Sequence, residues 1–310
     1  MTWIYLATIG QFLNALVAVL DKYIVSDEKV LPRPFVYAFY TCLITGGWVG
    51  IYFLGLIPGM AAIGVPQFSD VQFPTIQVVG MAFLAAYTFF IALVSMYEAL
   101  RKGDASDVMP VIGAVSAMSS FGLTYLFLGG NLTQNYIWGV ALLSTGTLLV
   151  STGRFNGTEV LHTIHSGLFF ALHYISMKAL FLETNFSDGF FWTRVTFVLF
   201  ALSLLLVPVY LEKIITHTKN ITRKAAVLVF HTKVLAGIAA FMLLKATDLG
   251  EVSVVQATDG LKFVFILLLG VLVGRYTPIT AGENAYDAQT IFRKVLYVAV
   301  ISIGFVILFI

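Results

Sequence analysis

Long apolar runs separated by short polar stretches form the main pattern along this chain. A helix needs roughly 20 apolar residues to cross the hydrocarbon core of a bilayer. Runs of this kind occupy residues 2–21, 35–56, 75–98, 106–128, 134–153, 161–182, 189–210, 225–246, 252–274 and 294–310. The pattern predicts an all-α integral membrane protein with ten transmembrane helices and almost no chain left for a soluble domain.

The composition favours the same fold class. Apolar residues make up 59% of the chain and charged residues only 11%, whereas a soluble domain carries about 25% charged residues. The mean hydropathy is +0.92. The single cysteine, Cys42, lies inside the second run, so no intramolecular disulfide can form. We expect no cleavable signal peptide, because no basic segment precedes the first run.

Basic residues are sorted between alternate loops. The loops that follow the first, third, fifth, seventh and ninth runs, with their flanking ends, hold 13 of the 18 lysines and arginines: Lys22, Lys29, Arg33, Arg101, Lys102, Arg154, Lys213, Lys219, Arg223, Lys224, Arg275, Arg293 and Lys294. Loops rich in lysine and arginine stay on the cytoplasmic side of a membrane. We therefore expect these loops in the cytoplasm and both termini outside it.

Two segments that start 147 residues apart, 98–130 and 245–274, carry nearly the same pattern. A weaker match between 15–25 and 171–181 pairs Lys22 with Lys178. The positions shared by the first two segments are Ala99 with Ala246, Gly103 with Gly250, Asp104 with Glu251, Ser106 with Ser253 and Gly113 with Gly260. We predict two repeats, 1–153 and 154–310, each of five helices. An odd number of spans per repeat inserts the second copy upside down, so the repeats are inverted.

The chain resembles the drug/metabolite transporter superfamily in its ten spans, in its glycine–acid–serine joins at 103–106 and 250–253, and in its glycine-rich ends at Gly129–Gly130 and Gly274. Within that superfamily it is most similar to the EamA-like transporters of bacteria and archaea. The resemblance implies a basket of helices with a central cavity between the repeats, working by alternating access. It also implies the inner membrane of a prokaryotic cell as the location.

Two charged residues lie near the middle of the ninth run. Asp259 and Lys262 are three residues apart, so they share one face of the predicted helix. Each charge at a bilayer centre costs about 2.5–3.5 kcal/mol, and an exposed i,i+3 ion pair returns only about 0.2–0.5 kcal/mol. We therefore expect both to face an aqueous cavity, with Thr258 and Gln256 as polar neighbours. The alternative is a self-neutralising structural pair between helices.

The stretch TDGLKFVFILLLGVL also resembles the ninth span of the sugar-phosphate and nucleotide-sugar branch of the same superfamily. That similarity implies a lysine that faces the cavity and holds an anionic substrate, a role that falls here to Lys262. Asp259 then tunes the site or binds an amine, and it is also a candidate for proton coupling. The pair suits an anionic or a zwitterionic solute, such as an amino acid.

A second group of candidates is basic and lies near the predicted outer ends of the sixth, seventh and eighth runs. It consists of Lys178, Arg194 and Lys245, with His173 one turn deeper. These residues are candidates for a vestibule that attracts anions. The alternative is local pairing, of Lys178 with Glu183 and of Lys245 with Asp248.

Two more residues are candidates for the cavity or for coupling. Asn14, in the first run, can line the cavity or bond across helices. Glu98 is a second candidate for proton coupling, and Lys102 is placed to form an i,i+4 pair with it.

Three charges near predicted helix ends have a simpler interpretation. We interpret Asp21 and Lys22 as an interfacial pair at the end of the first span. Lys233, near the start of the eighth run, is expected to be an anchor at the membrane surface.

No hydrolase, kinase or redox motif is present, and the cysteine and the five histidines have no metal-ligand spacing. We therefore expect no enzyme activity, cofactor, metal or nucleic-acid partner. The favoured function is secondary transport of a small organic metabolite through a midplane cavity lined by the ninth span. In this mechanism the helices around spans three and four alternate with those around spans eight and nine. The alternatives are a flippase for an amphipathic lipid-linked substrate and a non-transporting membrane scaffold or receptor.

Overall fold

The structure is a computed structural model of the chain. It describes residues 2–26, 33–60, 64–103, 105–129, 134–150, 157–218 and 221–273, together with 296–297, 299–301, 303–304 and 306–307. Most of the tenth apolar run, 294–310, lies outside the described residues. So do the predicted loop 275–293, Asp104, Gly130, Arg154 and Gly274.

Helices occupy each of the first nine apolar runs, and the described residues contain no strand. The helices are α1 (Thr2–Ser26), α2 (Pro34–Gly47), α3 (Ile76–Lys102), α4 (Ala105–Phe127), α5 (Gln134–Val150), α6 (Gly157–Glu183), α7 (Phe186–Leu204), α8 (Pro208–Thr218), α9 (Arg223–Leu249), α10 (Val252–Ala257) and α11 (Asp259–Val273), with 3₁₀ helices η1 (Trp48–Leu56) and η3 (Phe68–Asp70). The predicted all-helical class is confirmed for this part of the chain.

Three of the predicted spans are not straight α-helices. The second passes from α2 into η1 at Trp48. The seventh ends at Leu204, and α8 leaves it at 96°. Pro208 is the first residue of α8, where a proline has no backbone N–H to lose from the helix. The ninth span is interrupted at Thr258, between α10 and α11.

The distribution of side chains suits an apolar surrounding. Phe73, Ile76 and Leu206 are 95%, 88% and 83% exposed, while Lys233 and Arg194 are only 1% and 2% exposed. Five helices of the described chain are long and apolar enough to cross a membrane, or six when α7 and α8 count as one bent span. The fold is therefore that expected of an all-α membrane protein.

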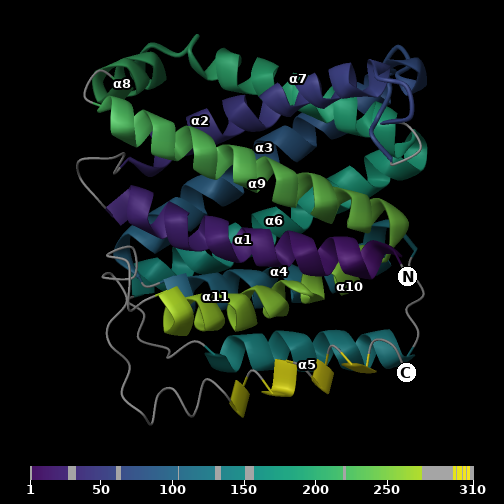
Figure 1. The fold of residues 1–310 in the computed structure, drawn as a ribbon, viewed down its shortest axis with the longest axis vertical. Coiled ribbons are helices and arrows are strands. Elements are labelled where there is room, and N and C mark those ends of the chain that lie inside the picture. Colours follow the sequence, from purple (N-terminus) through teal and green to yellow (C-terminus); the bar gives the residue numbers. More distant parts are fainter. Residues whose placement is uncertain are drawn as a thin grey trace.

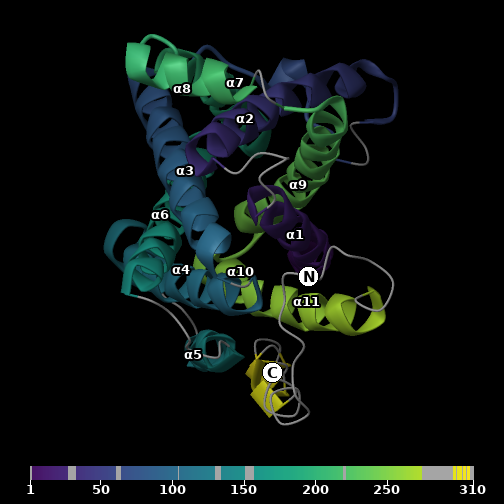
Figure 2. The same ribbon diagram turned by 90° about the vertical axis from the view of Figure 1, so that its left-hand side faces the viewer.

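Helices far apart in the sequence lie side by side (Figure 1). Helix α1 packs along α9, and α3 packs along α6. Figure 2 shows these two pairs facing each other, with α2 and α7 across one end and α4, α10 and α11 across the other. Helix α5 packs against α4 on the outside of this ring. The arrangement brings side chains of both predicted halves to the centre.

Candidate functional site

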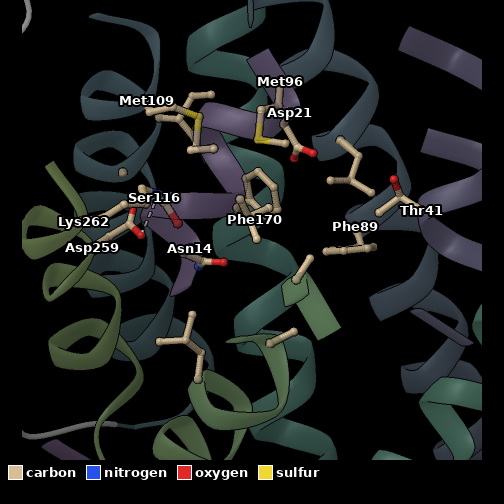
Figure 3. Close-up of a pocket in the computed structure, with 18 of the residues that line it drawn as sticks. Asn14, Asp21, Thr41, Phe89, Met96, Met109, Ser116, Phe170, Asp259 and Lys262 are labelled. Carbon is tan, nitrogen blue, oxygen red and sulfur yellow. Dashed lines mark hydrogen bonds and ion pairs between the residues drawn. The ribbon is translucent and has the colours of Figure 1, made fainter. Parts of the chain in front are cut away.

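A cavity of about 910 Å³, which includes space open to solvent, lies within the ring of helices. Its wall is built by α1, α2, α3, α4, α6, α9, α10 and α11. Its lining residues include the closely packed Gly113 and the polar or charged Gln11, Asn14, Asp21, Thr41, Tyr97, Ser116, Lys233, Gln256, Asp259 and Lys262. Figure 3 shows Asp259 and Lys262 on one side, Asp21 and Thr41 on the other, and the ring of Phe170 between them.

Asp259 and Lys262 form an ion pair in the cavity wall. Lys262 Nζ donates to Asp259 Oδ1 at 2.9 Å and to Oδ2 at 2.8 Å. The lysine side chain is 5% exposed and the aspartate side chain 16%. The interruption at Thr258 makes Asp259 the first residue of α11, so the carboxylate also lies at the positive end of a helix. Both residues therefore belong to the wall of this cavity.

Helix α4 approaches this pair through a glycine. A Cβ atom added at Gly113 would overlap Asp259 Oδ2 and would lie 3.3 Å from Asp259 Cγ. One turn further along α4, Ser116 Oγ donates to Gln256 Oε1 at 3.2 Å. Gly113 and Ser116 therefore bring a helix of the first half directly against the charged segment of the second half.

A second ion pair lines the cavity, away from the membrane surface where both of its residues were expected. Lys233 Nζ lies 2.7 Å from Asp21 Oδ1, and the two side chains are 1% and 4% exposed. The interpretation of Asp21 as an interfacial residue and of Lys233 as a surface anchor is therefore wrong. Helix α1 packs along α9, and this packing encloses both charges in the core.

Three hydroxyl groups complete the surroundings of this pair. The Tyr37 hydroxyl donates to Asp21 Oδ1, and Lys233 Nζ donates to the Tyr97 hydroxyl at 2.9 Å. The Thr41 and Tyr97 hydroxyls are 3.2 Å apart. Lys233 Nζ also lies 4.2 Å from the centre of the Tyr37 ring, at cation–π distance. We call Asp21, Tyr37, Thr41, Tyr97 and Lys233 the Asp21 cluster.

Helix α1 presents a polar stripe to the cavity. Gln11, Asn14, Ala18 and Asp21 follow the three- and four-residue spacing of one helical face, and all four line the cavity. Gln11 Oε1 is buried and has no hydrogen-bond partner in the described part of the chain. Asn14 is thus placed where the sequence predicted it. The same spacing was the signal that could have identified Asp21 as a cavity residue.

The predicted basic vestibule does not form one group at the cavity. Lys178 Nζ donates to the carbonyl oxygens of Thr247, Asp248 and Gly250 at 3.0, 2.9 and 3.1 Å, at the end of α9. Lys245 pairs with Asp248 at 2.8 Å, which was the alternative interpretation. Neither lysine is a lining residue among those described. The two lysines therefore hold the end of α9.

Arg194 and His173 lie behind the cavity wall. Arg194 on α7 has its guanidinium 4.5 Å from the ring centre of Phe190 and 4.7 Å from that of Phe197, and its Nε has no partner in the described chain. His173 on α6 donates from Nδ1 to the carbonyl of Ala85 at 2.9 Å. The lining residues of the described chain include neither of them.

The last two predicted candidates, Thr258 and Glu98, lie outside the described cavity wall. Thr258 is fully buried, and its hydroxyl donates to the carbonyl of Val255 at 2.6 Å, so it binds a backbone carbonyl at the interruption between α10 and α11. Glu98 pairs with Arg101 at 2.9 Å instead of with Lys102, and its side chain is 28% exposed. Neither residue belongs to the described cavity wall. No group of three or more His, Cys, Asp or Glu residues is placed to hold a metal ion in the described chain.

Comparison with known proteins identifies a fold and no activity. No family model matches the chain. The search of curated proteins also gives no match. A solved crystal structure of a protein with no stated function matches with a TM-score of 0.62, over 98% of this chain and 96% of that chain, at 20% sequence identity. Likeness at this identity shows that the two chains share a fold.

Proposed function

We propose that the protein is a secondary transporter that moves a small anionic or zwitterionic organic metabolite through the central cavity by alternating access. One observation carries the proposal: the Asp259–Lys262 pair lines a cavity between helices of both halves, next to an interruption in the helix that holds it. Interrupted spans at a central cavity are how many transporters present charged groups and helix ends to a solute.

The cavity wall supports the predicted inverted repeat. Five pairs of lining residues are separated by the same 147 positions as the repeated segments: Phe89 with Ala236, Leu93 with Ala240, Met96 with Leu243, Met109 with Gln256, and Ile112 with Asp259. In four of these five pairs the first repeat supplies the bulkier or more apolar side chain, and Met96 and Leu243 are similar in size and polarity. The second repeat supplies the space and the polar groups, so the proposed solute site is asymmetric.

Lys262 is the residue we assign to an anionic group of the solute. Its ammonium is held by one carboxylate, and a solute anion can share that ammonium or replace Asp259 as its partner. Asp259 keeps the empty cavity neutral and can accept a hydrogen bond from a solute amine. Asn14 and Gln11 offer further polar contacts along α1.

The way the helices pair supports an alternating-access mechanism. In the proposed cycle, α1, α9, α10 and α11 rock against α3, α4 and α6, and Gly113 and Ser116 form the contact that slides. Ten spans, an EamA-like place in the drug/metabolite transporter superfamily, a prokaryotic inner membrane and termini outside the cytoplasm are parts of the same proposal. The distribution of basic residues supports the orientation.

Thermal unfolding of the purified protein with added compounds tests the proposal. The panel contains benzoate, succinate, alanine, choline and a lipid-linked sugar, and the variants are Lys262→Met and, as an exposed control, Lys213→Met. A compound at 100 times its Kd stabilises the folded state by about 2.7 kcal/mol. We expect an anion or an amino acid to stabilise wild type and Lys213→Met but not Lys262→Met.

Two other outcomes favour the alternative functions. Stabilisation by the lipid-linked sugar alone would indicate a flippase. Unchanged melting in every compound, together with normal melting of an Asp259→Asn/Lys262→Met variant, would indicate a scaffold in which the pair is structural. For a compound that binds, counterflow into proteoliposomes then tests transport directly.

A further inference from the structure

The Asp21 cluster and the Asp259–Lys262 pair line the same cavity but differ in how their carboxylates are bonded. Asp259 uses both oxygens to bind Lys262 Nζ. Asp21 receives its hydrogen bonds from Lys233 and Tyr37, and both end on Oδ1. Among the described residues, no donor is bonded to Asp21 Oδ2. This oxygen is therefore a free acceptor on a carboxylate of the cavity wall.

The ammonium group of Lys233, by contrast, is held in place by other groups besides Asp21. Lys233 Nζ donates to the Tyr97 hydroxyl at 2.9 Å and lies 4.2 Å and 5.2 Å from the centres of the Tyr37 and Tyr97 rings. These contacts remain if the negative charge on Asp21 is removed. The cluster is thus built so that the carboxylate can change its charge while the ammonium stays in place.

From this difference we infer that Asp21 is a proton-binding site that couples proton binding to anion binding in the cavity. The carboxylate takes one proton on Oδ2 and becomes a carboxylic acid, and no other bond is formed or broken. Oδ1 continues to accept from Lys233 and Tyr37, and the new O–H group can donate into the cavity. The inference rests on the proposed function, since it assigns the coupling ion of that transporter.

The coupling follows from the charge of the cavity wall. With Asp21 ionised, the two ion pairs of the described wall sum to zero; with Asp21 protonated, they sum to one positive charge. A net charge enclosed in a low-dielectric interior is costly, so a bound monoanion and a bound proton stabilise each other. Such linkage is reciprocal. One proton then accompanies one bound monoanion, and the movement of the two together is electroneutral.

The groups that surround Asp21 do not duplicate this role. The titratable or charged residues that face Asp21 or share its cavity wall are Tyr37 and Cys42 on α2, Tyr97 on α3, Tyr174 on α6, Lys233 on α9, and Asp259 and Lys262 on α11, with Lys22 and Tyr23 next to it on α1. Of these, Asp259 is the one other carboxylate, and both its oxygens are already engaged. Glu98, a coupling candidate from the sequence, is paired with Arg101 outside the described wall.

Infrared difference spectroscopy of the full-length protein in proteoliposomes tests the site without a solute. A protonated carboxyl group has a C=O stretching band that a carboxylate lacks. Spectra are compared over a series of pH values, and we expect such a band in wild type and in Asp259→Asn, and its loss in Asp21→Asn. If Asp21→Asn does not fold, Asp21→Glu serves instead, because it shifts the frequency of the band. The inference is overturned if wild type shows no such band, or if the band is still present in Asp21→Asn and keeps the same frequency in Asp21→Glu.

Benzoate is the probe for coupling. We expect it to move the midpoint of the Asp21 band to higher pH, and its own affinity to rise by up to about tenfold per pH unit as the pH falls. In Asp21→Asn the affinity should no longer depend on pH. If benzoate stabilises wild type but leaves the band where it was, the coupling is overturned. If benzoate binds at no pH, the proposed anion site fails, and the titration without benzoate still decides the proton site.

Discussion

Lys22 and Lys178 make equivalent hydrogen bonds at the ends of two different helices. Lys22 Nζ donates to the carbonyls of Leu100 and Gly103 at 2.8 and 2.9 Å. Lys178 Nζ donates to those of Thr247 and Gly250 at 3.0 and 3.1 Å. Leu100 and Thr247, like Gly103 and Gly250, are separated by the 147 positions of the predicted repeat.

This relationship gives the two lysines a physical role. The last carbonyls of a helix have no partner within the helix, and in a membrane there is no water to bind them. Each lysine supplies the missing donors where α3 turns into α4 and where α9 turns into α10. Residues that the sequence alignment pairs thus do the same work in each half, which supports the repeat and gives Lys178 a structural task.

Replacement of Lys178 by Met should lower stability and leave solute binding intact. The change removes the donor for the carbonyls of Thr247, Asp248 and Gly250, and an unsatisfied buried polar group costs about 1–3 kcal/mol. Lys22→Met is the matched variant and should lose a similar amount. Unfolding in micelles measures both losses. If Lys178→Met instead melts like wild type and no longer responds to a stabilising anion, Lys178 belongs to a solute site after all.

Replacement of Gly113 by Ala should disable the proposed anion site with little loss of fold. The new methyl group would overlap Asp259 Oδ2, so the carboxylate must turn away and Lys262 must follow it or lose its partner. Gly122→Ala is the control, because it lies on the same helix and a Cβ there has no neighbour within 4 Å. We expect anion-dependent stabilisation to fall at least about tenfold in affinity, equal to about 1.4 kcal/mol, in Gly113→Ala alone.

The close packing of α9 against the start of η1 depends on another glycine. A Cβ atom at Gly237 would overlap the indole ring of Trp48, which is rigid and lies between helices. Overpacking of this kind typically costs about 1–3 kcal/mol. Gly237→Ala should therefore lower the melting temperature, whereas Gly50→Ala, in η1 with no neighbour near its Cβ position, should not. Equal melting of the two variants would show that Trp48 can move without cost.

The sequence predicted the helices well because the bilayer imposes a length and a polarity that hydropathy reads directly. It also placed Asp259 and Lys262 at a cavity, since two charges in an apolar run need one. It did not predict the interruption at Thr258 or the sharp turn at Pro208. Both depend on which carbonyls find donors locally, for example Val255 with the Thr258 hydroxyl, and hydropathy does not report such bonds.

Asp21 and Lys233 show a different limit. Each lies close to the end of an apolar run, where a charge can reach water, so the hydropathy pattern does not predict that it is buried. The two residues are 212 positions apart, and their contact depends on how α1 packs against α9. The pattern of a single sequence indicates the polarity of each helix but not which other helices it packs against. The stripe from Gln11 to Asp21 was available and would have placed Asp21 correctly.

A double-mutant cycle on Asp21 and Lys233 should reveal a large and non-additive coupling. Removing one partner leaves the other charge buried and unpaired, which costs about 3–5 kcal/mol. Lys233→Met should lose stability on this scale. Asp21→Asn should lose less, because Tyr37 and Tyr97 still hold the Lys233 ammonium, and the double variant should lose much less than the sum of the two. Unfolding in micelles at one pH gives the three free energies.

The exposed pair Glu98–Arg101 provides the comparison cycle, because its side chains are 28% and 36% exposed and its coupling should be only about 0.2–1 kcal/mol. A coupling for Asp21 and Lys233 no larger than this would mean that water reaches the cluster in solution. The single variants separate two further readings. If Asp21→Asn is much less harmful than Lys233→Met, the cluster tolerates a neutral Asp21, as proton binding there requires.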